Sequence, residues 1–340
     1  MTRLLLALAC VVGAVLLSGV QASAGEKVIV GWIPTVSPYE AAICGDSFSD
    51  ATGYEVDWRK FESGPSVIAA LASGEVPISF LGSTPAAAAI SQGLEIDVFW
   101  VVSFIATGEA LIARPEAGIT GPQDLRGKTL ATPFGSTSHY HLLVALKNFG
   151  IAPEEAKIVG MTPPQIAAAW TRGDIDGSYV WDPVLAKLKD QGGKVVVDSG
   201  QLADWGEAIL NLFVVRKDWA KEHPEFMAAF VSKVAKMDAD YRQNPSSWAA
   251  DSEHAGCLES LMGVKPADVP RILETFVFPS LTEAVTPEWI GGSDGGRVAR
   301  WLKLTAEFLK DQNKISNVLP DYGVGVTDRW AKEALKESSQ

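Results

Sequence analysis

The chain has 340 residues, of which 47% are apolar, and its 29 Lys and Arg residues against 41 Asp and Glu give a formal net charge of −12. An acidic surface without a Lys/Arg cluster repels nucleic acid and anionic lipid, which argues against binding of polyanions. The length exceeds that of one ordinary core and predicts two lobes of roughly 100 to 200 residues each.

Residues 1–24 have the features of a signal peptide. Arg3 gives a positive start, residues 4–17 are all apolar or glycine, and Ala22 and Ala24 are small residues at the positions that a signal peptidase reads. The apolar run is shorter than the ~20 residues that span a bilayer, which disfavours a membrane anchor. We therefore expect an exported, soluble mature chain that begins at residue 25.

The first part of the mature chain alternates between β-prone and helical patterns. Strands are expected at residues 28–33, 54–61, 76–81 and 96–104, and helices at 39–51, 66–73 and 85–92. Strand, helix and strand at this spacing predict βαβ units in a mostly parallel sheet. In such sheets, ligands bind at the carboxyl ends of the strands.

A second alternation follows. Its strands are expected near residues 129–132, 157–159, 177–180 and 194–197, with helices between them, followed by a β-prone run at 209–216 and a helical tail from Pro224 onward. The pattern predicts a second α/β unit inserted into the first.

We therefore predict the α/β class with two lobes and a helical C-terminal tail. Lobe 1 is discontinuous and comprises residues 25–114 and 215–340, and lobe 2 comprises residues 115–214. The chain would cross twice, near residues 109–113 and 211–215, and these two segments would form the hinge beside a ligand-binding cleft.

Polar residues follow several strands just before a helical run. Ser83 and Thr84 precede Pro85, Asp182 precedes Pro183, and Ser136 and Thr137 form a related turn without proline. The polar side chain caps the helix and proline fits its first turn. Free amides and the helix dipole at such turns bind a small anion without a cation. Ordinary helix capping is the alternative, which the recurrence in both lobes disfavours.

A zwitterionic ligand also needs a carboxylate or an aromatic face for its ammonium group. Glu109, beside the predicted hinge, and Asp182 are the candidate carboxylates, although Asp182 is equally a candidate helix cap. The aromatic candidates lie near strand ends or loops, where core or surface positions are the alternatives. They are Trp32, Tyr140, Trp181 and Trp205.

The sequence offers little for catalysis, so we expect no enzyme, no cofactor and no metal. His139 and His141 are two residues apart, which turns them to different faces of a helix. The patterns HExxH, CxxC and GxxxxGK[ST] do not occur. Cys44 and Cys257 remain in the mature chain, and the spacing leaves open whether they form a disulfide or stay separate thiols.

Several blocks resemble the taurine-binding periplasmic proteins of ABC importers. They are Tyr-Glu-Val-Asp-Trp-Arg-Lys-Phe at 54–61, Ala-Ala-Leu-Ala-Ser-Gly at 69–74, Leu-Gly-Ser-Thr-Pro at 81–85, Ser-Thr-Ser-His-Tyr at 136–140, Arg-Gly-Asp-Ile-Asp-Gly at 172–177 and Tyr-Val-Trp-Asp-Pro at 179–183. The resemblance extends from about residue 31 to residue 218 and thins into the helical tail.

This resemblance implies a type II periplasmic-binding-protein fold that closes on a small-molecule ligand. It further implies a periplasmic receptor, expected to be a monomer, that delivers taurine or another sulfonate to an ABC permease and, through it, to the ATPase subunit. The turns at Ser83–Thr84 and Ser136–Thr137 would then face the cleft and bind the sulfonate oxygens.

Two segments depart from the family pattern. Taurine receptors commonly carry Trp-Gly-Ala-Pro-Thr-Leu-Asp where this chain has residues 205–211, so neutral Asn211 replaces an acidic residue, and the first loop at 32–38 also differs. The pocket therefore either prefers another oxyanion, such as an unaminated sulfonate or nitrate, or has moved its negative charge to Glu109 or Asp182.

Overall fold

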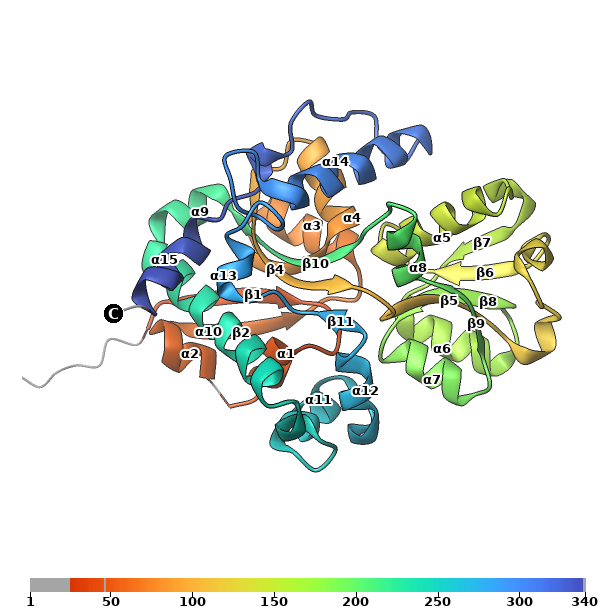
Figure 1. Cartoon of the computed structure of the whole chain (residues 1–340), viewed down its shortest axis with the longest axis horizontal. Helices are drawn as coiled ribbons and strands as arrows, with labels where there is room; N and C mark the ends of the chain where they lie inside the picture. Colours follow the sequence, from red (N-terminus) through yellow and green to blue (C-terminus); the bar gives the residue numbers. More distant parts are fainter. Residues whose placement is uncertain (1–24, 46, 339–340) are drawn as a thin grey trace, which may run out of the picture.

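The computed structural model describes residues 25–45 and 47–338, so the predicted signal peptide lies outside the described part of the chain. The chain forms two α/β lobes that lie side by side along the longest axis of the molecule (Figure 1). In the described part of the chain, no helix is long and apolar enough to cross a membrane.

The first lobe contains a six-stranded sheet with the strand order β11-β4-β10-β3-β1-β2. Its strands are β1 (Lys27–Trp32), β2 (Glu55–Lys60), β3 (Ile78–Gly82), β4 (Ile96–Ile105), β10 (Leu210–Arg216) and β11 (Phe276–Val277). Strand β1 pairs in parallel with β2 and β3. Strand β10 is antiparallel to β3 and β4, and β11 is antiparallel to β4.

The second lobe contains a five-stranded sheet with the order β7-β6-β8-β5-β9. Its strands are β5 (Glu109–Ala113), β6 (Thr129–Thr132), β7 (Lys157–Gly160), β8 (Gly177–Trp181) and β9 (Lys194–Asp198). Strand β6 is parallel to β7 and β8, whereas β5 is antiparallel to β8 and β9. Both sheets are therefore mixed, but the mostly parallel arrangement that the sequence predicts holds for the strand directions. Strands β1, β2, β3 and β4 point one way in the first sheet and β6, β7, β8 and β9 point one way in the second, whereas β10, β11 and β5 run against them. In each lobe, a strand next to an interlobe crossing runs against its neighbours.

Helices cover the sheets of both lobes (Figure 1). The first lobe has α1 (Pro38–Ala41), α2 (Ser47–Thr52), α3 (Gly64–Ser73), α4 (Ser83–Ser91), α9 (Lys217–Glu222), α10 (Pro224–Gln243), α11 (Glu253–Met262), α12 (Val269–Leu273), α13 (Leu281–Ala284), α14 (Gly296–Asp311) and α15 (Arg329–Glu337). The second lobe has α5 (Thr137–Asn148), α6 (Pro163–Arg172), α7 (Val184–Asp190) and α8 (Ser199–Asp204). Short 3-10 helices are η1 (Pro115–Ala117), η2 (Pro122–Leu125), η3 (Pro153–Glu155), η4 (Pro245–Trp248), η5 (Pro266–Asp268) and η6 (Gly323–Gly325).

The sheets place two strands differently from the predicted lobe boundaries at 114 and 215. Strand β5 pairs within the second sheet and β10 within the first, so the chain crosses between the lobes at residues 106–108 and 205–209. The predicted hinge segments, 109–113 and 211–215, are interior strands. A short apolar run indicates a buried strand but does not reveal which of two sheets the strand joins, because a strand can form the same backbone hydrogen bonds in either sheet.

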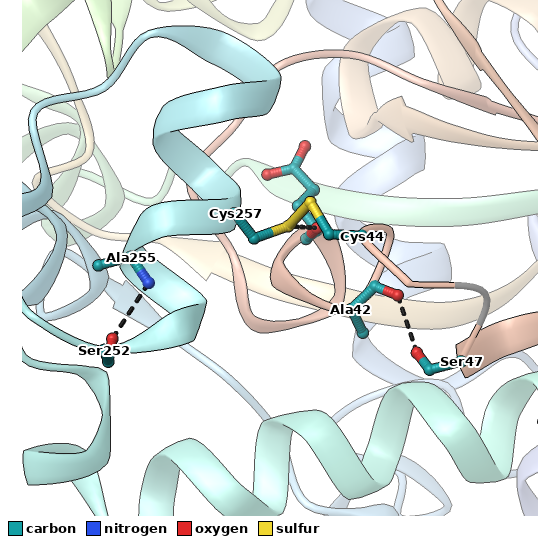
Figure 2. Close-up of a disulfide and its surroundings, with 7 residues drawn as sticks. Ala42, Cys44, Ser47, Ser252, Ala255 and Cys257 are labelled. Atoms are coloured by element: carbon teal, nitrogen blue, oxygen red, sulfur yellow. Dashed lines mark hydrogen bonds between the residues drawn. A yellow bond between two sulfur atoms is a disulfide. The ribbon is translucent and has the colours of Figure 1, made fainter.

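A disulfide joins Cys44, which follows α1, to Cys257 in α11, with their Cα atoms 5.9 Å apart. Figure 2 shows this bond between the two segments, beside the turn in which Ser47 Oγ donates a hydrogen bond of 2.8 Å to the Ala42 carbonyl. Both cysteines belong to the first lobe. Of the two alternatives left open by the sequence, pairing is therefore the one that the structure contains.

Candidate functional site

A small cavity lies between the two lobes, where β1, β3, β6 and β8 end. The first lobe contributes Ile33, Thr35, Gly64, Phe80, Gly82, Pro85, Asn211 and Phe276 to its lining, and the second contributes Glu109, Ser136, Thr137 and Trp181. Its volume is about 30 Å³, which is room for little more than water. A larger ligand therefore requires the lobes to separate around it.

Glu109 is the first residue of β5, and its carboxylate is held inside the second lobe. Thr137 Oγ1 donates to Glu109 Oε1 at 2.6 Å, and Ser138 Oγ donates to Oε2 at 2.7 Å. The side chain is only 3% exposed. Burial raises the pKa of Glu109 to about 7, against the two hydroxyl bonds, which lower it. A buried carboxylate of this kind is available to a cationic ligand group.

Helix α5 begins at the cavity. Its N-cap, Ser136, accepts a hydrogen bond from the His139 amide at 3.1 Å. The amides of Thr137 and Ser138 belong to the first turn, where N–H groups have no carbonyl partner within the helix. Together with the helix dipole, these amides favour negative charge in front of Ser136 and Thr137.

Helix α4 also begins beside the cavity, at the end of β3. Ser83 and Thr84 are both buried in its first turn, although the cavity lining at this point is formed by Gly82 and Pro85. Ser83 Oγ accepts a bond of 3.1 Å from the Leu210 amide, which attaches the returning strand β10 to this turn. Thr84 Oγ1 is buried and has no hydrogen-bond partner within the described part of the chain.

Trp181 forms a wall of the cavity and connects the lobes. It ends β8 in the second lobe, and its indole Nε1 donates to the Pro34 carbonyl of the first lobe at 3.0 Å. The ring is almost entirely buried. Of the four aromatic candidates, Trp181 is the one that lines the cavity.

Asp182 lies outside this cavity. Its Oδ1 accepts a bond of 2.8 Å from the Ala186 amide, in the first turn of α7. Its Oδ2 is buried and unpartnered among the described residues, and burial raises the pKa of Asp182 to about 6. The helix-cap alternative therefore describes its geometry, and Glu109 is the carboxylate that faces the cavity.

The structure does not bring three of the predicted aromatic residues to the cavity. Trp32 precedes Ile33, and neighbouring residues of an extended segment face opposite sides, so Ile33 faces the cavity and Trp32 instead packs beneath Lys60. Tyr140 donates a hydrogen bond to Glu207 and packs on the Phe308 ring of α14.

Trp205 follows α8 at the surface, where its side chain is 45% exposed and contacts the ring of Phe149.

Sequence reasoning missed most of the first-lobe lining. Thr35 follows the end of β1, so the rule that ligands bind at carboxyl strand ends was sufficient to find it. Asn211 was noted only as a missing acid, whereas its Nδ2 donates to Ser103 Oγ at 3.0 Å and the residue lines the cavity. Phe276 belongs to a two-residue strand in the helical tail, and no sequence pattern indicated it.

Comparisons with known proteins give consistent findings. The NMT1-like family matches residues 21–255. The chain is 41% identical over 306 residues to the taurine-binding periplasmic protein of Escherichia coli (strain K12), which covers 90% of this chain and 93% of that protein.

Solved structures show the same two-lobed fold. The alkanesulfonate-binding protein SsuA from Xanthomonas axonopodis pv. citri, bound to MOPS, matches with a TM-score of 0.72 at 19% identity, over 89% of this chain and 98% of that one. The desulfurization enzyme DSZB matches with a TM-score of 0.64 at 14% identity, over 92% of this chain and 99% of that one. The predicted periplasmic-binding-protein fold is confirmed.

Proposed function

Because the chain belongs to the NMT1-like family, we propose that it is the substrate-binding component of an ABC importer that captures taurine or a related small sulfonate in the periplasm. The observation that carries this proposal is the interlobe cavity in which a buried carboxylate, Glu109, lies next to the start of helix α5. Such a site offers one place for an ammonium group and another for an oxyanion.

The sulfonate group is assigned to the helix starts. Among the described residues that line the cavity, none is a Lys, Arg or His, so an anion would be bound by amides and hydroxyls. Ser136 and Thr137 supply backbone amides from α5, because their hydroxyls already donate to the Pro133 carbonyl and to Glu109. The turn at Ser83 and Thr84 supplies amides and hydroxyls from α4. Many oriented donors in a dry cleft favour an anion whose charge is spread over several oxygens.

The ammonium group is assigned to Glu109. Asp182, the alternative carboxylate, bonds the first turn of α7 and does not line the cavity. Ionised Glu109 already accepts two hydroxyl bonds, and a carboxylate has further lone pairs for a ligand N–H. The aromatic face of Trp181 adds an apolar wall for the short carbon chain.

Ligand capture requires relative movement of the lobes. The two crossings at residues 106–108 and 205–209 are the hinge in this proposal, and the bond from Trp181 to Pro34 favours the closed arrangement. The protein binds reversibly, catalyses no reaction and acts as a monomer. A membrane permease and, through it, an ATPase subunit are its partners.

Calorimetric titration of the mature chain tests this function. Three ligands are compared: taurine has an amine and a sulfonate, ethanesulfonate has only the sulfonate, and nitrate is an oxyanion without sulfur. Their affinities show how much each group contributes to binding. We expect saturable one-site heat with taurine and weaker binding of ethanesulfonate, and no heat with either sulfonate would reject the ligand class. Mass spectrometry of the recovered ligand checks the absence of catalysis, because a chemically altered ligand would contradict a pure binding role.

A receptor for unaminated sulfonates is the second candidate. Neutral Asn211 favours it, because this residue lines the cavity where the related receptors commonly carry an acid. This candidate predicts that ethanesulfonate binds at least as tightly as taurine.

A further inference from the structure

We propose that Glu40 is a positioning residue that, together with the Cys44–Cys257 disulfide, holds the loop of residues 33–37 in the conformation that binds ligand. We call residues 33–37 the first-strand loop. The inference rests on the proposed function for its ligand, although not for the structure of the loop.

The carboxyl group of Glu40 is buried beneath the first-strand loop, with none of the residue exposed. The Thr35 amide donates to Glu40 Oε1 at 3.1 Å, Ser37 Oγ donates to Oε2 at 3.3 Å, and Tyr39 Oη donates to Oε1 at 3.3 Å. The loop has no regular secondary structure, so a side-chain acceptor takes the place of a backbone partner.

The first-strand loop contacts the cavity and the opposite lobe. Ile33 and Thr35 line the cavity, and the Pro34 carbonyl between them accepts the hydrogen bond of Trp181. A shift of this loop therefore moves one wall of the site and the interlobe bond at the same time. Its position affects ligand affinity by both routes.

The disulfide fixes the other end of the same unit. Helix α1 has four residues, which is too few to be stable by itself. Cys44 lies four residues after Glu40, and Cys257 Sγ lies 3.7 Å from the Glu40 carbonyl oxygen. Figure 2 shows the bond between the α1 segment and α11. The crosslink thus holds Glu40 at a defined distance from α11.

Packing on the cavity side completes the support. The Tyr39 ring lies 6.1 Å from that of Phe80, which lines the cavity, and 4.8 Å from that of Phe213 in β10.

Removal of the Glu40 carboxyl would leave the Thr35 amide unpartnered in a buried place, which favours movement of the loop. Burial raises the pKa of Glu40 well above its usual value, so the neutral glutamine is the matching conservative replacement.

The test compares Glu40→Ala, Glu40→Gln and a control, Asp238→Asn, in the full mature chain. Asp238 is also a buried carboxyl of the first lobe, in α10, and it lies outside both the first-strand loop and the cavity lining. Hydrogen exchange of peptides covering residues 33–37 measures the loop without ligand. Taurine titration measures affinity, and thermal unfolding measures stability.

We expect Glu40→Ala to accelerate exchange in the first-strand loop and to weaken taurine binding by about tenfold or more, since a buried donor loses its partner. Glu40→Gln should keep both the exchange rate of the loop and the taurine affinity within about threefold of wild type, because it keeps an acceptor for the Thr35 amide. Asp238→Asn should change only the unfolding temperature. Wild-type exchange and affinity in Glu40→Ala, or equal effects of Glu40→Ala and Asp238→Asn, would overturn the proposal.

A separate variant tests the contribution of the disulfide. The variant Cys44→Ser/Cys257→Ser should weaken taurine binding in the same direction as Glu40→Ala, and the combined variant should lose less than the product of the two effects, because both act on one loop. Independent, multiplicative losses would separate the disulfide from Glu40 and overturn the joint role. If the wild type binds no sulfonate, the proposed function fails, and the exchange measurements still decide whether Glu40 positions the loop.

Discussion

Thr137 Oγ1 lies 2.6 Å from Glu109 Oε1, so the first residue of α5 is bonded to the first residue of β5. Both residues belong to the second lobe and both line the cavity. The place assigned to the sulfonate and the place assigned to the ammonium are therefore fixed relative to each other before the lobes close. The second lobe alone therefore sets the distance between the Glu109 carboxylate and the start of α5, and α4 of the first lobe joins the anion site on closure.

Replacement of the two candidate carboxylates should have unequal effects. Glu109→Gln should weaken taurine binding by about 2 kcal/mol or more, the cost typical of a lost buried charge partner, and should spare ethanesulfonate. Asp182→Asn keeps an acceptor for the Ala186 amide and should leave taurine affinity nearly intact. Calorimetric titration of both variants checks this, and an equal or larger loss in Asp182→Asn would assign the amine to Asp182.

The affinity for taurine should rise with pH. The pKa of Glu109 is about 7 in the ligand-free chain, so its ionised fraction increases roughly tenfold from pH 6 to pH 8, and the apparent affinity for an amine follows that fraction. Ethanesulfonate, which has no amine, should gain nothing from the same change. Titrations at the two pH values provide the measurement, and a flat taurine profile would argue against an ammonium contact with Glu109.

The stability of the ligand-free chain should depend on Glu109 in the opposite direction. Its folded pKa is raised to about 7 from 4.5, so the native state keeps a proton that the unfolded state has lost. The stabilisation that this proton gives the folded state is fully present below pH 4.5. It is lost as the pH rises through 7, which lowers the free energy of unfolding by about 3 kcal/mol. Urea unfolding of the wild type and Glu109→Gln should therefore show a stability difference that changes in favour of the variant as the pH rises.

Loss of the interlobe bond should weaken closure. Trp181→Phe keeps an aromatic wall and removes the donor to the Pro34 carbonyl, so taurine affinity should fall by about 1 kcal/mol. Trp248→Phe is the matched control, because it also removes an indole donor, which bonds to Asp240 Oδ2 at 3.0 Å, and lies outside the cavity and both crossings. Calorimetry distinguishes the two, and a loss in Trp248→Phe as large as in Trp181→Phe would contradict the assignment.

Tyr140→Phe should affect stability rather than ligand binding. The variant removes the hydrogen bond from Tyr140 to Glu207, which joins α5 to the second crossing, and leaves the cavity lining unchanged. A loss of about 1 kcal/mol in urea unfolding is expected, with the taurine affinity within about twofold of wild type. A tenfold loss of taurine affinity would contradict this prediction and would mean that Tyr140 contacts the ligand or controls closure of the lobes.

Local patterns predicted most strands of both lobes, because alternation of β-prone and helical runs depends on neighbouring residues only. Strand β6 was expected at its observed residues, 129–132. The helix expected at 39–51 is instead two helices, since α1 ends at Ala41 and α2 begins at Ser47. Which sheet a strand joins depends on contacts between distant residues, so β5 and β10 were placed in the wrong lobes.

The same distinction applies to the site. Polar residues at strand ends led to Ser136 and Thr137, because this rule follows from the local geometry of a strand and the helix after it. The rule does not say which neighbour of a strand end faces the cleft, and so Trp32 was chosen where Ile33 lines the cavity. Phe276 reaches the cavity from a tail segment far away in the sequence.

The bond between Cys44 and Cys257 turns the stretch between them into a covalent ring that contains the whole second lobe. A protease that cuts the chain once at any exposed loop of that lobe therefore produces two fragments that remain attached. They would separate on a denaturing gel only after a reductant is added. The receptor can thus be nicked in its second lobe without losing either part to the surrounding solution.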